Sequence, residues 1–156
     1  TSVDPSSGIA TQTNNPAHYK GVEGQISYQP AKGLTFIANG SISSAKDSVT
    51  QMWLAQAPSS TAALGAVYKS KNFKFSYIHK FTGQQFADTA QLVRILPYSN
   101  GTLAASYKIG PAWLGVTVYN VFDATPTTKI GGSTGAQPLY FFQPGRSYQA
   151  QLKFRF

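Results

Sequence analysis

Residues that could carry out catalysis are few in this 156-residue sequence, and their spacing does not favour a catalytic site. The five carboxylates lie far apart along the chain: Asp4, Glu23, Asp47, Asp88 and Asp123. The two histidines, His18 and His79, have no partner at metal-ligand spacing, and there is no cysteine. No serine stands in a nucleophile-elbow pattern. The sequence therefore predicts no enzyme, no metal site and no bound cofactor.

Basic side chains suggest binding instead. Lys74, Lys80, Lys153 and Arg155 occupy polar positions of alternating segments, so we expect them to share one face of a sheet. Lys74 and Lys80 could attract an anionic ligand such as a ferric chelate, while salt bridges to residues outside this chain are the alternative. The net charge of +8 is scattered along the sequence, which argues against nucleic acid as a partner.

Three consecutive aromatic residues, Tyr140, Phe141 and Phe142, stand just before Pro144 in a long polar segment. Aromatic rings on an exposed loop could stack on a chelator or on a sugar. They could equally pack beneath the loop or join a belt of aromatic side chains. These rings are therefore candidates for ligand binding, with a structural role as the alternative.

The segments that position these side chains are expected to be strands. Polar and apolar residues alternate with a period of two in seven stretches, without an error in 147–156. Charged residues make up only 12% of the chain, about half the ~25% usual in soluble proteins. No run of 18 apolar residues is present, which excludes a transmembrane helix. We expect strands at about 18–29, 34–44, 61–69, 73–82, 98–108, 113–122 and 147–156.

The connections between these strands alternate between short and long. The short ones are 30–33, 70–72 and 109–112; the long ones are 45–60, 82–97 and 123–146, with 1–16 as a further long segment. This alternation is typical of transmembrane β-barrels, which have short periplasmic turns and long extracellular loops. A soluble β-sandwich is the alternative, but we would expect charged residues on its outer face. The polar positions here are mostly Ser, Thr, Gln, Gly and Asn.

Aromatic residues gather near the ends of the expected strands. Those beside the short turns are Tyr28, Phe36, Tyr68, Phe73, Phe75, Tyr107, Trp113, Phe154 and Phe156. A looser set lies towards the long loops: Tyr19, Phe81, Tyr98, Tyr119 and Tyr148. Two such belts are typical of barrels at the two membrane interfaces.

Four short motifs, in a fixed order, resemble elements of TonB-dependent outer-membrane receptors. Asn120-Val-Phe-Asp123 resembles their N-[LV]-F-D element, and Pro144-Gly-Arg-Ser-Tyr148 resembles their PGR-x-[YF] element. Tyr19-Lys-Gly-Val-Glu23 resembles their Y-x-G-[VIF]-E strand, and Leu96-Pro-Tyr98 resembles the opening of a later strand. We expect the motif residues to shape a loop more than to touch a ligand. They are Asn120, Phe122, Asp123, Pro144, Gly145 and Arg146.

The resemblance implies an all-β fold, an antiparallel up-and-down meander of about seven transmembrane strands. Residues 1–156 would be the C-terminal part of a ~22-stranded barrel with a plugged lumen, as a fragment or a split gene product. The implied function is TonB-dependent uptake of a scarce nutrient, most often a ferric siderophore, across the bacterial outer membrane. The C-terminus would be periplasmic. Implied partners are membrane lipid, the rest of the barrel with its plug domain, TonB–ExbB–ExbD and the barrel assembly machinery.

The last strand carries a further expectation from the resemblance. Its aromatic end resembles the C-terminal signal that outer-membrane assembly machinery reads, with Tyr148, Phe154 and Phe156 as the residues that bear it. Two other functions stay open. The chain could be a structural module that completes a barrel with another chain, or a small stand-alone barrel of adhesin type. The stand-alone barrel requires an eighth strand within 1–16, where no alternation is present.

Overall fold

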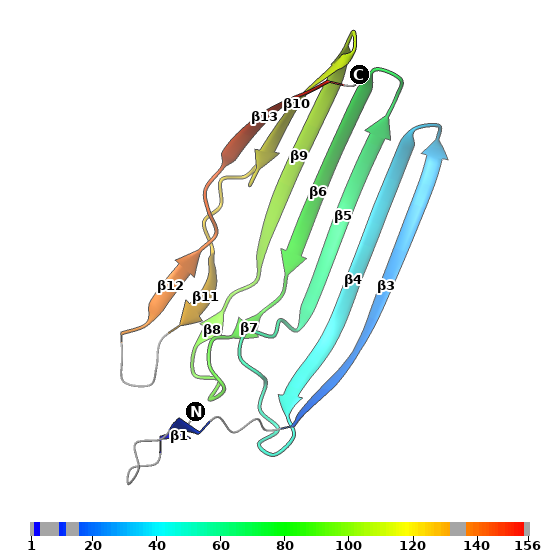
Figure 1. Ribbon diagram of the computed structural model, residues 1–156. Helices are drawn as coiled ribbons and strands as arrows, with labels where there is room; N and C mark the ends of the chain where they lie inside the picture. Colours follow the sequence, from blue (N-terminus) through cyan, green and yellow to red (C-terminus); the bar gives the residue numbers. More distant parts are fainter. Residues whose placement is uncertain (1, 4–9, 12–15, 132–136, 155–156) are drawn as a thin grey trace.

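The computed structural model describes residues 2–3, 10–11, 16–131 and 137–154. Seven long strands form one antiparallel sheet (Figure 1). They are β3 (Ala17–Ala31), β4 (Leu34–Asp47), β5 (Ser60–Lys69), β6 (Phe73–Thr82), β9 (Tyr98–Ile109), β10 (Ala112–Tyr119) and β13 (Ser147–Phe154). Each long strand pairs with the next one along the chain, so the sheet order is β3-β4-β5-β6-β9-β10-β13. The expected all-β, up-and-down meander of seven strands is confirmed.

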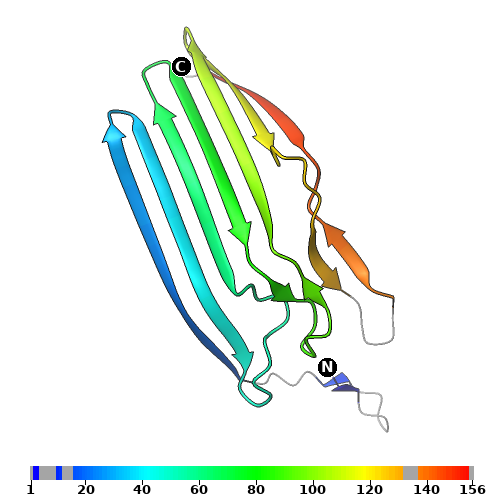
Figure 2. The same ribbon diagram turned by 180° about the vertical axis from the view of Figure 1, so that it is seen from behind.

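The two ends of the sheet differ. Short turns close one end, which we call the turn end, at residues 32–33, 70–72 and 110–111. Long connections close the other, the loop end, at 48–59, 83–97 and 120–146; Figure 2 shows both ends from behind. Short strands pair within these connections: β7 (Gln85–Phe86) with β8 (Arg94–Ile95), and β11 (Thr127–Gly131) with β12 (Leu139–Phe142). In the described part of the chain, no helix is long and apolar enough to cross a membrane.

The described residues before β3 do not extend the sheet. Strands β1 (Ser2–Val3) and β2 (Ala10–Thr11) pair with each other and form a separate two-stranded ribbon. Within the described residues, β3 and β13 are the two edges of the seven-stranded sheet. An eighth strand from 1–16, which a small closed barrel would need, is therefore not part of the sheet that the structure describes.

Within the described ranges, three strand ends differ from the expected ones by two residues or more. β4 continues to Asp47, three residues further than expected. β3 continues through Pro30 to Ala31, with a shift of register between Tyr28 and Ala31. Pro30, which has no N–H to donate, is tolerated there because it lies within the register shift, where the hydrogen-bond ladder is already interrupted. β10 ends at Tyr119 because Asn120 has a φ of 51°, which no strand adopts.

The register keeps the alternation in phase across the sheet. Val116 of β10 lies opposite Ala105 of β9 and Ala150 of β13, and Val22 of β3 lies opposite Ile42 of β4. Directly opposite residues of antiparallel strands point to the same side. The sheet therefore has one face of apolar side chains, the apolar face, and one of mostly polar side chains, the polar face.

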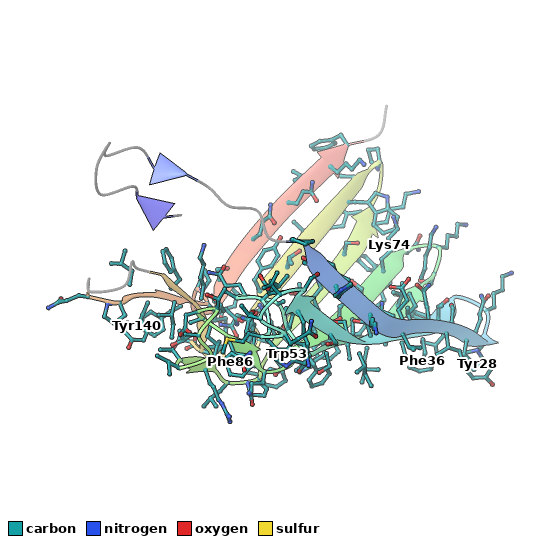
Figure 3. The ribbon with its side chains drawn as sticks, turned by 90° about the horizontal axis from the view of Figure 1, so that it is seen from below. Tyr28, Phe36, Trp53, Lys74, Phe86 and Tyr140 are labelled. Atoms are coloured by element: carbon teal, nitrogen blue, oxygen red, sulfur yellow. The ribbon has the colours of Figure 1, made fainter. Side chains whose placement is uncertain are left out.

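The apolar face is uncovered by any other layer of the described chain. Figure 3 shows Tyr28 and Phe36 on one side of the ribbon and Lys74 on the other. Val22 is 80% exposed and Tyr148 is 69% exposed. The apolar residues that are buried among those described are three: Ala45, Ile95 and Ala112. A contiguous apolar face of this extent is typical of a surface that contacts an apolar environment.

The aromatic belts are only partly as expected from the sequence. Trp113 was placed in the belt beside the turns, but it lies on the polar face, opposite Lys108 and Lys153. Tyr19, Tyr98 and Tyr119 of the second set also have the parity of the polar face, where the Tyr119 hydroxyl donates to Oε1 of Gln149 at 2.8 Å. The correction follows from strand alternation, because each of these rings occupies the other parity from its neighbours on the apolar face.

Gly33 in the first turn is a position where a side chain is excluded. Its φ is 83°, and a Cβ there would overlap the carbonyl oxygen of Lys69, whose N–H donates to Gly33 O at 2.7 Å. Gly110 shares the positive φ, at 58°, but has nothing within 4 Å of a Cβ. Gly24 likewise has nothing within 4 Å and carries no positive φ.

These three glycines separate the steric effect from the backbone effect. In the full-length protein, Gly110→Ala is expected to lower stability by about 1–2 kcal/mol, the penalty of a left-handed alanine. Gly33→Ala should lower it further, because the β4–β5 contact must also open. Gly24→Ala is the control and should change little. The unfolding temperature of each variant is measured from the loss of the folded band in gels of heated samples. Equal shifts of the unfolding temperature in all three variants would contradict the expected order.

Candidate functional site

The two motifs at the ends of the longest connection meet around one buried amide. Asn120 is only 2% exposed. Its Nδ2 donates to the carbonyl oxygens of Ala124 at 2.7 Å and Pro144 at 2.8 Å, and its Oδ1 accepts from the N–H of Ala124 at 3.2 Å. One side chain therefore links the start and the end of the connection across 24 residues.

A carboxylate supports this link. Asp123 Oδ1 accepts the backbone N–H of Arg146 at 2.7 Å, and Asp123 N–H donates to Asn120 O at 2.9 Å. A Cβ at Gly145 would lie 3.2 Å from Asp123 Oδ1, so a glycine leaves room for the carboxylate. We call Asn120, Asp123 and their partners at 144–146 the loop clamp. Its geometry closes a loop and leaves the Arg146 side chain outside the clamp's hydrogen bonds.

Phe122 joins the loop clamp to the apolar face. Its ring centroid lies 5.5 Å from that of His79, which in turn lies 4.3 Å from Phe81. The hydroxyl of Tyr77 and Nδ1 of His79 are hydrogen-bonded at 2.8 Å. Tyr77, His79 and Phe122 lie around Gly101, where a Cβ would meet Phe122 at 3.1 Å. This cluster was not predicted from the sequence, where the i, i+2 spacing of Tyr77 and His79 is the one signal for it.

The aromatic candidates at 140–142 lie on β12 and divide between the two sides of the β11–β12 ribbon. Tyr140 and Phe142 stack, with ring centroids 6.4 Å apart and planes 20° apart. Phe141 lies on the other side, where Nζ of Lys129 is 5.6 Å from its ring. Figure 3 shows Tyr140 at the outer part of the ribbon. Tyr140 and Phe142 are 54% and 59% exposed, so this pair is accessible to a ligand.

Two buried glutamines support the β11–β12 ribbon, and one of them links it to the neighbouring loop. Gln85 is 6% exposed, and its Nε2 donates to the carbonyl oxygen of Thr128 at 3.0 Å. Gln143 is 8% exposed and acts within its own connection: its backbone N–H donates to Pro126 O at 3.0 Å, and its Nε2 donates to Ala124 O at 3.3 Å. Ile95 of β8, at 1% exposure, is the most buried large side chain described. These glutamines cannot be predicted as buried from the sequence, because a glutamine in a polar loop belongs to no recognisable pattern.

Lys74 and Lys80 share the polar face but do not form one site. They are six residues apart on β6, and six residues of strand span roughly 20 Å. Lys74 lies at the turn end, opposite Lys69, with its Nζ 4.2 Å from the centroid of Trp113. Lys80 lies towards the loop end, opposite Asn100. The two lysines grouped by the sequence are therefore separated by most of the strand length.

The remaining candidates lie on or beyond the edge strand. Tyr148 and Phe154 of β13 are on the apolar face, 69% and 53% exposed. Arg155 and Phe156 lie outside the described residues. Over the described ranges, no three side chains of His, Cys, Asp or Glu come together in a group that could hold a metal ion.

No family model matches the chain, and no curated protein matches it either. Solved structures do match. The copper transporter OprC has a TM-score of 0.77 and 21% identity, over 92% of this chain and 24% of OprC. The ferric yersiniabactin uptake receptor FyuA from Yersinia pestis has a TM-score of 0.78 and 17% identity, over 90% and 24%. The ferric citrate transporter FecA has a TM-score of 0.74 and 20% identity, over 92% and 26%.

These similarities concern the fold, because the identities are low. The matched proteins are outer-membrane β-barrel receptors and transporters, and this chain spans about a quarter of their length. The resemblance to TonB-dependent receptors that the motifs indicated therefore holds for the architecture. The seven strands have the fold of a segment of the wall of such a receptor barrel.

Proposed function

We propose that this chain forms the C-terminal part of the barrel wall, with its extracellular loops, of a TonB-dependent receptor that takes up a scarce nutrient, most often a ferric siderophore. The observation that carries the proposal is the superposition of nearly the whole sheet on such receptors, with one continuous apolar face. Outer-membrane transport of this kind needs a wall that is apolar towards lipid and polar towards the lumen.

The orientation follows from the two unequal ends. Short turns belong on the periplasmic side of such barrels and long loops on the outside, so the turn end and the C-terminus are periplasmic in this proposal. The rest of the barrel and the plug domain would pair with β3 and β13 and fill the lumen. TonB–ExbB–ExbD would act through that remaining part, and the barrel assembly machinery would insert the chain, reading Tyr148, Phe154 and Phe156.

The proposal is tested on the full-length protein in cells starved of iron or copper. We expect the protein in the outer-membrane fraction and uptake of a radiolabelled ferric or cupric chelate that disappears when either this gene or TonB is deleted. A panel of chelates identifies the cargo. Outer-membrane location with uptake that is independent of TonB would contradict the transport proposal and favour a structural module.

We propose the stacked pair Tyr140 and Phe142 as a cargo contact. The variant Tyr140→Ala/Phe142→Ala is expected to weaken cargo binding roughly tenfold, since each aromatic contact contributes about 0.5–1.5 kcal/mol. Phe141→Ala is the matched control, because this ring faces Lys129 on the other side of the ribbon. Binding to whole cells, measured at several cargo concentrations, checks the difference. An equal loss in both variants would show that the rings stabilise the ribbon only.

Lys80 is proposed as a second, electrostatic contact for an anionic cargo. It projects from the half of the polar face that is nearer the loops, where a ligand would enter. Lys74 is too far along the strand to act on the same ligand. Its surroundings indicate a different role.

A further inference from the structure

Four lysines surround one tryptophan at the turn end of the polar face. Lys69 and Lys74 lie directly opposite each other on β5 and β6. Lys108 of β9 and Lys153 of β13 both lie opposite Trp113 of β10. Nζ of Lys74 lies 4.2 Å from the centroid of the Trp113 ring. We call these five residues the lysine–tryptophan cluster.

The charges of this cluster have no counterpart nearby in the described chain. The described carboxylates lie elsewhere: Glu23 in β3, Asp47 at the end of β4, and Asp88 and Asp123 in the long connections. Like charges placed directly opposite on neighbouring strands destabilise a sheet. The Trp113 ring attracts one ammonium group by about 0.5–1 kcal/mol but neutralises none. Such an arrangement is best explained by an anionic partner.

The surface around the cluster is hollowed. One hollow of about 380 Å³ is lined by Lys74, Ser106, Trp113, Gly115, Gln151 and Lys153. A second, towards the turns, shares Lys74 and Trp113 with it, and a third, farther up the strands, shares Ser106 and Gly115. The small side chain of Ser106 and the lack of a side chain at Gly115 leave the bottom of the first hollow open. Three adjoining hollows form a groove along the strands, which suits an extended segment better than a compact ion.

The position of the groove favours a polypeptide over a lipid. The cluster projects from the polar face, opposite to the apolar side chains that would contact the bilayer, so lipid headgroups beside the apolar face are on the other side of the sheet. Cargo would approach from the loop end, on the far side of the groove. A polypeptide segment inside the barrel can therefore reach the groove more directly than a lipid or an entering ligand.

We propose that the lysine–tryptophan cluster binds an acidic segment of polypeptide, rich in Asp or Glu, supplied inside the barrel by a part of the receptor outside residues 1–156. This rests on the proposed function, which makes the polar face the wall of the lumen. The carboxylates of the segment pair with Lys69, Lys74, Lys108 and Lys153, and its backbone lies along the groove over residues 106 and 115.

The test places a photo-reactive amino acid at Ser106 of the full-length protein in outer membranes and identifies the attached peptide by mass spectrometry. We expect one peptide of the same receptor with several carboxylates. The variant Lys69→Gln/Lys74→Gln should lower the yield at least fivefold, and Lys69→Arg/Lys74→Arg should retain it. Ser41, on the polar face beside Glu23, is the control position and should not capture this peptide.

Three results overturn the inference: attachment to lipid or lipopolysaccharide, attachment to a neutral or basic peptide, or a yield unchanged by the glutamine variants. Uptake measured on the same membranes distinguishes this inference from the proposed function. Capture of an acidic peptide without TonB-dependent uptake rejects the transport proposal alone. TonB-dependent uptake without such capture rejects only the role of the cluster.

Discussion

Asn120→Ala is expected to destabilise the full-length protein by about 2–4 kcal/mol, because it removes the hydrogen bonds on which the loop clamp depends. The carbonyl oxygen of Pro144 loses the donor that Asn120 supplies, in surroundings where Asn120 itself is 2% exposed. Pro144 and Ala124 are exposed residues, so the expected cost comes from the three lost hydrogen bonds, at about 0.5–1.5 kcal/mol each. We expect cleavage by protease within 120–146 and a lower unfolding temperature.

Two further variants divide this effect into its parts. Asn120→Gly keeps the positive φ of 51° without strain, so it should be milder than the alanine variant by about 1 kcal/mol. Asn120→Asp replaces the amide donor by a carboxylate that faces two carbonyl oxygens, so it should be at least as damaging as alanine. Asn39→Ala, at an exposed position of β4, is the control. If Asn120→Ala unfolds at the same temperature as that control, the loop clamp is not a source of stability.

Val116→Arg is expected to prevent stable insertion of the barrel wall into the outer membrane. Val116 lies midway along β10 on the apolar face, between Ala105 and Ala150, and is 46% exposed. An arginine at the bilayer midplane of a barrel costs about 2–4 kcal/mol. The expected result is a reduced folded fraction in the outer membrane, measured from the heat-modifiable band.

The neighbouring residue provides a matched control for this prediction. Thr117→Arg introduces the same side chain one position later in β10, on the polar face, and should leave insertion nearly normal. Val116→Leu should also insert, because it keeps the site apolar. Equal insertion of Val116→Arg and Thr117→Arg would mean that the apolar face does not contact lipid, and the orientation proposed for the sheet would be wrong.

The loop clamp shows how a short motif can be recognisable before its role is visible. The sequence places Asn120 and Asp123 at the end of one strand and Pro144 just before the next. Side chains of Asn and Asp favour such strand ends because they bond to nearby backbone groups. The sequence does not show that the Asn120 amide donates to the carbonyl oxygen of Pro144, 24 positions later.

The sequence by itself determined the strands, their order in a meander and the side to which most residues point. These properties depend on local alternation and turn chemistry, which any short segment of the chain carries. Only the tertiary structure decided which side chains meet. Register across five strands places Trp113 among lysines that lie up to 84 residues apart, Lys69 to Lys153. The length of β6 separates Lys74 from Lys80. Contacts between strands depend on which distant segments pair and in which register. The pattern along one strand therefore cannot predict them.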